Sequence, residues 1–203
     1  MANKNERPIV EVRGLPQSTM ELREDDDGKR TLTGYAVKWE MKSHPLGFFE
    51  EFREQFKRGA FTESLTKDDQ RALWSHDTSK VLGRTGNGTL RLFEDEVGLR
   101  FELDLPKTTL GNDTYETIRR GDVDGVSFGF IPRKQEWDET DSENIIRSIT
   151  DAQLMEISPT AWAAYPDSGV SARSNNPYKE YRQEKQATEN EILKAKLILA
   201  TYL

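Results

Sequence analysis

The chain has 203 residues, of which 34% are hydrophobic and 32% are charged, which is enough for one domain with a core and polar tails. Its formal net charge of -7 argues against a general nucleic-acid-binding protein, because such proteins present a basic surface to phosphates. The absence of cysteine excludes disulfides, thiolate nucleophiles and cysteine-ligated zinc.

The two ends of the chain carry no strong targeting signal. The N-terminal stretch MANKNERPIVEVRG lacks the apolar run of a signal peptide. The apolar stretch ILKAKLILATYL near the other end is interrupted by Lys194 and Lys196, which is not typical of a membrane span. We therefore expect a soluble cytoplasmic protein with no membrane partner.

The first third of the chain predicts strands followed by a helical segment. Residues 9–13 and 20–24 have the pattern of short strands, and the turn DDDGK at 25–29 leads into an alternating strand over 31–39. The opening is therefore predicted to be a β-hairpin. Five phenylalanines over residues 48–61 are spaced mostly three to five apart, which predicts amphipathic helical turns with aromatic core residues: Phe48, Phe49, Phe52, Phe56 and Phe61.

The middle of the chain predicts a strand, a loop, a hairpin and a helix. Residues 71–77 form a short apolar run that stops at a glycine-containing loop over 77–88, which would place His76 at the rim of a strand. Two alternating segments over 89–106 predict a hairpin. A helix is expected from Thr108 to Arg120, ended by Gly121.

Two later strands carry polar residues opposite their bulky faces. Val126, Phe128 and Phe130 alternate with Ser127 and Gly129, so Ser127 is expected to point away from the bulky side of its strand. A later strand alternates in the same way and turns Glu156 outward. A charged segment that begins near Pro177 predicts a C-terminal helix.

The pattern as a whole predicts a mainly β fold with flanking helices (α+β). We expect about seven short strands to form a compact, closed or nearly closed β-barrel. The predicted domains are a barrel over residues 1–173 and a charged helical tail over residues 174–203.

The stretch Gly125-Val-Ser127-Phe-Gly129 spells G-x-S-x-G, a motif of serine hydrolases. The nucleophile elbow of α/β-hydrolases requires a strand, a sharp turn, a helix and a histidine after the serine. Both histidines, His44 and His76, precede Ser127, and more strand is predicted after it. The elbow interpretation is therefore rejected.

A serine nucleophile still needs a base, and His76 is the better candidate. His44 stands in a loop before a proline, where a surface histidine is common. Asp77 follows His76 directly, but neighbours on a strand point to opposite faces, so the orienting acid must come from elsewhere. Glu156 is the outward carboxylate on a late strand. On residues alone this triplet is one of many, since the chain has 36 acidic residues.

Several stretches between Gly34 and Ala172 add a more specific signal. In chain order they read GYAVKW, RGAF, LWSHD, LGRTGNGTLRL, DEVGLRFELDLP, IRRGDVDGVSFGF and LMEISPTAWAAYP. In this order the chain resembles the prohead (procapsid) maturation proteases of HK97-type tailed bacteriophages, which are distant relatives of the herpesvirus capsid assembly protease.

The resemblance implies a site and a function. Ser127 would be the nucleophile, His76 the general base and Glu156 the orienting acid, in a shallow site on the outer surface of a herpesvirus-protease-like barrel. The enzyme would be a serine endopeptidase inside the assembling procapsid in the host cytoplasm. It would cleave the scaffolding segment of the major capsid protein and also its own chain, and the herpesvirus relatives suggest a dimer. No cofactor, metal or nucleic acid is implied.

Two alternatives remain open at this stage. A catalytically silent barrel could act as a capsid scaffold or assembly protein, and an esterase or amidase could use the same triad. Gly125 and Gly129 have two interpretations as well: they relieve crowding where a strand bends, or they give substrate access to Ser127. The C-terminal segment is either a delivery or packaging element or a solvated helix.

Overall fold

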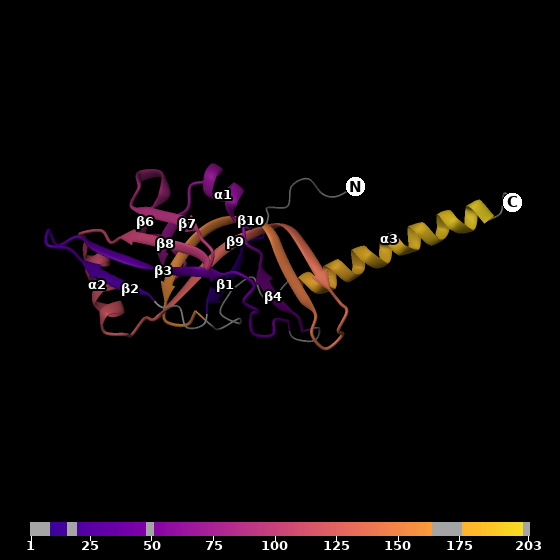
Figure 1. Cartoon of the computed structure of the whole chain (residues 1–203), viewed down its shortest axis with the longest axis horizontal. Helices are drawn as coiled ribbons and strands as arrows, with labels where there is room; N and C mark the ends of the chain where they lie inside the picture. The colour runs from indigo at the N-terminus through magenta and orange to yellow at the C-terminus, as the bar shows by residue number, and fades with distance from the viewer. Residues whose placement is uncertain (1–8, 16–19, 48–50, 164–175, 201–203) are drawn as a thin grey trace.

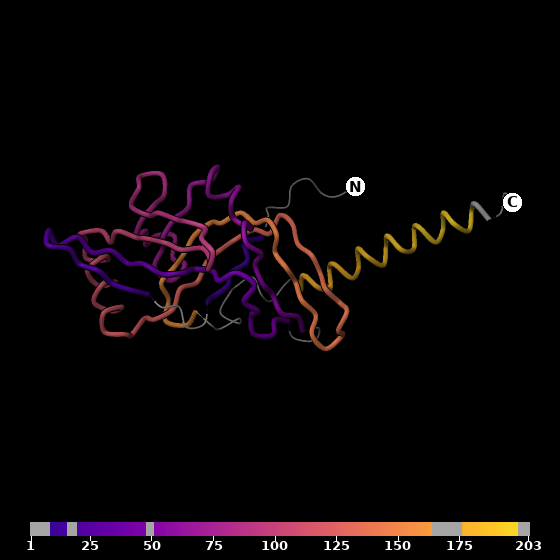
Figure 2. Tube along the Cα trace, in the orientation of Figure 1, coloured from indigo at the N-terminus to yellow at the C-terminus, as the bar shows by residue number. Residues whose placement is uncertain are grey.

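The computed structural model describes residues 9–15, 20–47, 51–163 and 176–200 (Figures 1 and 2). Within these ranges the strands form two sheets. The six-stranded sheet has the order β1-β9-β10-β5-β6, with β4 also paired to β10, and the four-stranded sheet has the order β2-β3-β8-β7. The strands are β1 (Glu11–Leu15), β2 (Glu21–Glu24), β3 (Arg30–Lys38), β4 (Arg53–Phe56), β5 (Arg71–Trp74), β6 (Asp77–Arg84), β7 (Leu90–Glu94), β8 (Gly98–Asp104), β9 (Gly125–Asp138) and β10 (Ile146–Thr160).

The two sheets share one hydrophobic core because each strand turns its alternate apolar side chains inward. Leu99, Phe101 and Leu103 of β8 are buried, and so are Phe128 and Phe130 of β9. Aromatic side chains fill the centre of this core, where the ring of Phe56 lies 5.3 Å from that of Phe128 and 5.0 Å from that of Phe130. Phe128 and Phe130 therefore pack in the core from the inward face of β9, and Ser127 lies on the opposite face of this strand.

The predicted closed barrel is wrong. The mainly β class with flanking helices is correct, but the two sheets are not joined by a backbone ladder among the described residues. They approach one another where β1 and β9 lie near β3, and where β6 lies near β7 and β8. Both seams are packed by side chains without strand pairing, so the fold consists of two open sheets around a common core.

The helical turns predicted over residues 48–61 are also wrong where they fall in the described part of the chain. Residues 53–56 form β4, which pairs in parallel with β10, with Arg53 opposite Ile146. Phe48 and Phe49 lie outside the described residues. The only helix near this segment in the described ranges is α1 (Thr62–Lys67), which follows Phe61. Pairing with β10 overrides the local spacing of the phenylalanines.

Other elements differ in extent. Most of the expected loop over residues 77–88 is strand β6. The later strand expected around Glu156 is part of one long strand, β10, with irregular register near Asp151 and Glu156. Ten strands therefore replace the predicted seven within the described ranges. The hairpins β2–β3 and β7–β8 are confirmed.

The two longer helices agree with the predicted positions. Helix α2 (Thr109–Arg119) is capped by the Thr108 side chain, which accepts a hydrogen bond from the Gly111 N–H, and ends before Gly121, whose φ is 79°. Helix α3 (Pro177–Ala200) projects from the β9–β10 end of the molecule (Figure 1). The division proposed at residues 173–174 lies outside the described residues.

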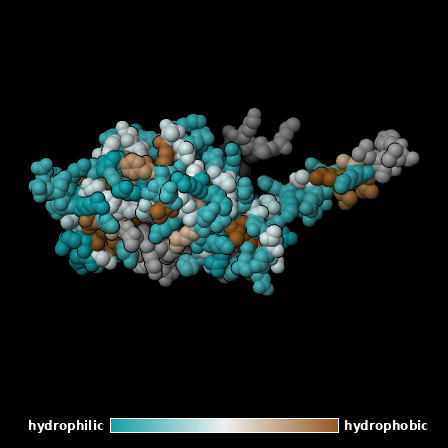
Figure 3. Space-filling view, viewed as in Figure 1, coloured by the Kyte–Doolittle hydropathy of each residue, from teal (hydrophilic) through white to brown (hydrophobic). Residues whose placement is uncertain are grey.

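Helix α3 is attached through its first turns. Tyr178 and Tyr181 pack against Trp137, with ring centroids 5.1 Å and 5.3 Å apart, and the Tyr178 hydroxyl donates to Glu139. Farther along the helix, apolar side chains are exposed, and Figure 3 shows them on the projecting part: Ile192, Leu193, Leu197 and Ile198.

Candidate active site

His76 lies in a two-residue turn between β5 and β6. Ser75 and His76 have φ values of 49° and 62°, the left-handed conformation of a tight hairpin turn, and Trp74 pairs with Asp77 across it. The Ser75 N–H donates to the carbonyl of Pro159 at 3.2 Å, which holds the turn against β10. His76 thus projects from a short, constrained connection, as its predicted position at the end of a strand requires.

The side chains of His76, Glu156 and Ser158 form a closed set of hydrogen bonds. The Nδ1 of His76 lies 2.7 Å from Oε1 of Glu156. The Ser158 hydroxyl donates to Oε2 of the same carboxylate at 2.6 Å and accepts from the backbone N–H of His76 at 3.0 Å. Because both carboxylate oxygens and the backbone of the turn are engaged, the imidazole has a fixed orientation relative to β10.

Ser127 lies on the same face of the sheet as this set of hydrogen bonds. It stands directly opposite Ser158 in the antiparallel pair of β9 and β10, and side chains at paired positions share a face about 5 Å apart. The Ser127 hydroxyl does not point to water: it donates to the carbonyl of Arg13 in β1 at 2.7 Å. Ser127 is only 4% exposed, so it is more deeply buried than the shallow surface site that we expected.

The two glycines of G-x-S-x-G are required by close approach. Gly129 stands opposite Glu156, and a Cβ at Gly129 would lie 2.8 Å from Oε1 of that carboxylate. A Cβ at Gly125 would lie 2.4 Å from the Cβ of Ala163, where the chain passes over β9. Because Gly129 has no side chain, the carboxylate of Glu156 that holds His76 fits against it. Crowding therefore explains Gly129, but the crowding group is Glu156 of the site and not a bend in the strand.

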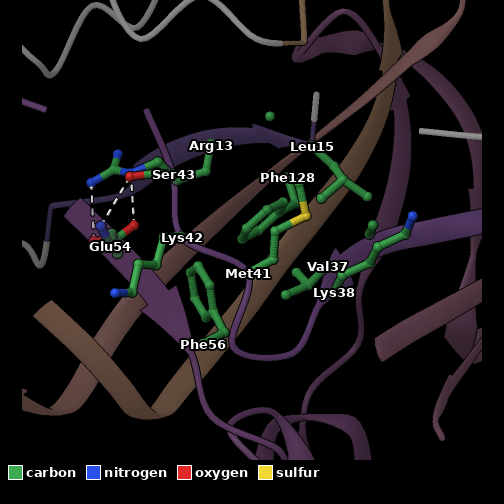
Figure 4. A pocket seen from close by; sticks show the side chains of 12 residues that line it. Arg13, Leu15, Val37, Lys38, Met41, Lys42, Ser43, Glu54, Phe56 and Phe128 are labelled. Atoms are coloured by element: carbon green, nitrogen blue, oxygen red, sulfur yellow. Dashed lines mark hydrogen bonds and ion pairs between the residues drawn. The ribbon is translucent and has the colours of Figure 1, made fainter. Parts of the chain in front are cut away.

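A buried group of charges lies behind β9, on the face opposite Ser127. Arg147 donates to Glu54 at 2.7 Å and to Glu11 at 2.7 Å and 2.9 Å, and Arg13 donates to Glu54 at 2.8 Å. Burial raises the pKa of Glu11, but the hydrogen bonds and charges of Arg147 and Arg13 outweigh it and hold this pKa below its ordinary value. We call Glu11, Arg13, Glu54 and Arg147 the buried ion network; Figure 4 shows its Arg13–Glu54 contact.

A family model described as caudovirus prohead serine protease matches residues 18–183, which is more than half of the chain. The chain belongs to the caudovirus prohead serine protease family. Among solved structures, this prohead protease is similar to one titled "Structure of the bacteriophage T4 capsid assembly protease, gp21", with a TM-score of 0.51 and 10% sequence identity. The match covers 76% of this chain and 98% of that one, and at this identity it shows the fold alone. No curated protein matches the chain.

The three predicted site residues of the protease therefore lie on neighbouring elements. His76 and Glu156 are in direct contact, whereas the Ser127 hydroxyl donates its hydrogen bond to the Arg13 carbonyl. His44 is exposed, as expected for a surface histidine, and Asp77 bonds to Ser79 rather than to the imidazole. None of the helices in the described ranges has the length and hydropathy that a membrane crossing requires.

Two residues of the site were not predicted. Ser158 could have been found, because it follows Glu156 by two positions on one strand and so shares its face. The contact of Arg13 could not, because nothing in the local sequence indicates that β1 pairs with β9, more than a hundred positions farther along the chain. Among the residues described, no three His, Asp or Glu side chains are grouped as metal ligands.

Proposed function

We propose that this chain is the serine endopeptidase of capsid maturation, with Ser127 as nucleophile, His76 as general base and Glu156 as orienting acid. The observation that carries the proposal is the 2.7 Å contact between His76 Nδ1 and Glu156, on the face of the sheet where Ser127 lies, in a member of a prohead serine protease family. Its substrates would be the scaffolding segment of the major capsid protein and its own chain, inside the procapsid in the host cytoplasm, with a dimer as a further proposal.

The proposed chemistry follows from the fixed orientation of the imidazole. With Nδ1 held by Glu156, Nε2 is the nitrogen that takes the proton of Ser127 as the hydroxyl attacks the peptide carbonyl carbon. His76 then returns this proton to the leaving amine, and a water molecule activated in the same way hydrolyses the acyl-enzyme. Glu156 stabilises the imidazolium that forms in each step.

The experiment is intact-mass spectrometry of the matching major capsid protein, co-expressed with the protease. The arms are the wild-type protease, Ser127→Ala and, as a matched control, Ser79→Ala in the exposed part of β6. We expect a discrete loss from the N-terminal end of the capsid protein with wild type and Ser79→Ala, and none with Ser127→Ala. Intact capsid protein in all three arms, despite assembled shells, would contradict the proposal.

One observation favours a second candidate, a catalytically silent assembly protein. The Ser127 hydroxyl donates a hydrogen bond to the Arg13 carbonyl, and the Ser127 side chain is buried. Both features are expected of a serine with a structural role. This candidate predicts that Ser127→Ala assembles and matures capsids as wild type does. An esterase on the same residues would instead cleave small activated esters and leave the capsid precursor intact.

A further inference from the structure

Strand β1 is an edge strand laid along the strand that carries Ser127. Its partner in the described part of the sheet is β9, with Gly14 opposite Ser127 and Val12 opposite Gly129. The family model begins at residue 18, after β1. The element that covers the edge of β9 therefore lies outside the part of the chain that matches the family.

The position of β1 brings one of its peptide groups to the serine. The carbonyl oxygen of Arg13 lies 2.7 Å from Ser127 Oγ, and the next residue, Gly14, is the one paired with Ser127. A peptide substrate must present its scissile carbonyl to Ser127 Oγ. An open sheet edge binds a peptide in an extended conformation through backbone hydrogen bonds. The Arg13 carbonyl accepts the proton that His76 would have to take, so in this pose β1 blocks the serine.

We propose that β1 occupies the place of the substrate strand on β9, and that the site takes an extended peptide with a basic residue before the scissile bond and an acidic residue two positions earlier. The inference rests on the proposed function and adds to it a substrate preference and an inhibitory element. The substrate strand replaces β1, with its basic residue at the position of Arg13 and its acidic residue at that of Glu11.

The charge preference comes from the two buried partners of β1. Side chains two positions apart share a face of a strand, and those of Glu11 and Arg13 both point to the face of β9 opposite Ser127. There Arg13 meets Glu54 at 2.8 Å, and Glu11 meets Arg147 at 2.7 Å. Glu54 and Arg147 are 2% and 1% exposed, and charge-assisted hydrogen bonds at such buried positions discriminate strongly against neutral side chains.

The residues that follow Arg13 add shape to this preference. A Cβ at Gly14 would lie 1.1 Å from the carbonyl oxygen of Ala163, so the residue after the scissile bond has to be glycine. Leu15 lies beside a cavity of about 50 Å³ whose apolar lining includes Val37, Met41 and Phe128 (Figure 4). An apolar side chain is therefore favoured at the second position after the bond.

Release of β1 leaves no unmatched charge in the buried ion network. The strand contributes one anion, Glu11, and one cation, Arg13, while Glu54 and Arg147 remain paired with each other at 2.7 Å. Breaking a buried ion pair is costly chiefly because it strands an uncompensated charge. Because the residues left behind form a neutral pair, a substrate strand with the same two charges can exchange with β1.

The first test places the substitutions in a peptide substrate, so that the enzyme itself is the unmodified full-length protein. A donor–quencher peptide with the sequence of residues 8–17, PIVEVRGLPQ, is compared with its Glu11→Gln and Arg13→Gln forms. We expect cleavage between the arginine and the glycine, read by mass spectrometry, and a loss of at least about tenfold in kcat/KM with either neutral peptide. The Ser127→Ala protein should cleave none of them.

The second test asks whether β1 competes with the peptide. The full-length Glu11→Ala/Arg13→Ala variant removes the ion pairs that attach β1 to Glu54 and Arg147. It should raise kcat/KM for the parent peptide about tenfold, because β1 competes less well with the peptide. The matched control is Glu21→Ala/Arg23→Ala, which removes an ion pair of the same spacing from exposed β2 and should leave kcat/KM unchanged. Melting temperatures of both variants report whether folding is retained.

The outcomes separate this inference from the proposed function. If the protease cleaves the capsid precursor but cleaves charged and neutral peptides equally well, or cleaves none of the three, the inference is wrong and the function stands. If neither the wild type nor the folded β1 variant cleaves the precursor or any peptide, the proposed function itself fails. An unchanged or lower kcat/KM in the folded β1 variant would overturn the inhibitory role of β1.

Discussion

Ser158 lies directly opposite Ser127 on the neighbouring strand, and its hydroxyl joins the carboxylate of Glu156 to the backbone N–H of His76. One buried hydroxyl thus holds both the acid and the turn that carries the imidazole. His76 adopts a left-handed backbone conformation, which a non-glycine residue keeps only when its surroundings hold it there. Ser158 is therefore a positioning residue of the proposed triad rather than a catalytic one.

Replacing Ser158 should reduce turnover without loss of the fold. We expect Ser158→Ala to lower kcat by about tenfold to a hundredfold, because the imidazole is no longer held in place, while KM changes little. The measurement is steady-state cleavage of a peptide substrate. The near-isosteric Ser158→Cys should recover part of kcat, since a thiol is a weak donor and acceptor.

The control for this variant is Ser148→Ala, another buried serine of the same strand, whose hydroxyl bonds to Gln55 away from the site. It should leave kcat unchanged. Equal losses of kcat in both variants, in step with losses of melting temperature, would show that Ser158 has only a structural role.

The identity of the orienting acid can be tested by a matched pair of amide substitutions. Glu156→Gln keeps the shape of the side chain that meets His76 but removes its charge, so kcat should fall on the order of a thousandfold or more. Asp77→Asn makes the same change next to His76 in the sequence, where the carboxylate bonds to Ser79, and should cost little. A larger loss in Asp77→Asn would mean that the wrong acid has been assigned.

The sequence predicted the alternation of the strands better than their partners. The inward phenylalanines of β9 and the outward Ser127 follow from side-chain period alone. The pairing of β4 with β10 depends on contacts between residues about ninety positions apart, and the local phenylalanine spacing favoured a helix instead. The alternation of apolar residues in single strands does not determine closure into a barrel. Closure depends on whether the strands at the two places where the sheets approach come close enough to pair.

The proposed triad was predicted from motifs and the family resemblance, while the residues around it were not. His76 and Glu156 meet as expected, and the role of Gly129 became clear only when the register placed it against Glu156. The hydrogen bond from Ser127 to Arg13 joins two residues that are 114 positions apart in the sequence. Such contacts are set by tertiary packing, which periodicity does not encode.

The close approach of Gly129 to Glu156 can be tested by enlarging the first residue and shortening the second. Gly129→Ala introduces a methyl group 2.8 Å from the carboxylate, which must shift and take His76 with it, so kcat should fall by about a hundredfold. Shortening the acid relieves this contact. The double variant Gly129→Ala/Glu156→Asp should therefore be more active than Gly129→Ala alone, as measured by peptide cleavage; strictly additive losses would contradict the contact.

The buried ion network predicts how the hold on β1 depends on pH. The pKa of Glu11 is lowered in the folded protein, from an ordinary value of 4.5, because the arginines outweigh the effect of burial. A lowered pKa means that the ionised carboxylate contributes stability above pH 4.5, and that this contribution is lost as the pH falls through the folded value. Glu11→Gln should therefore lower the melting temperature near neutral pH and lose less stability than wild type on acidification to about pH 3. The exposed Glu21→Gln should follow wild type throughout, and parallel curves for wild type and Glu11→Gln would rule out this contribution of Glu11.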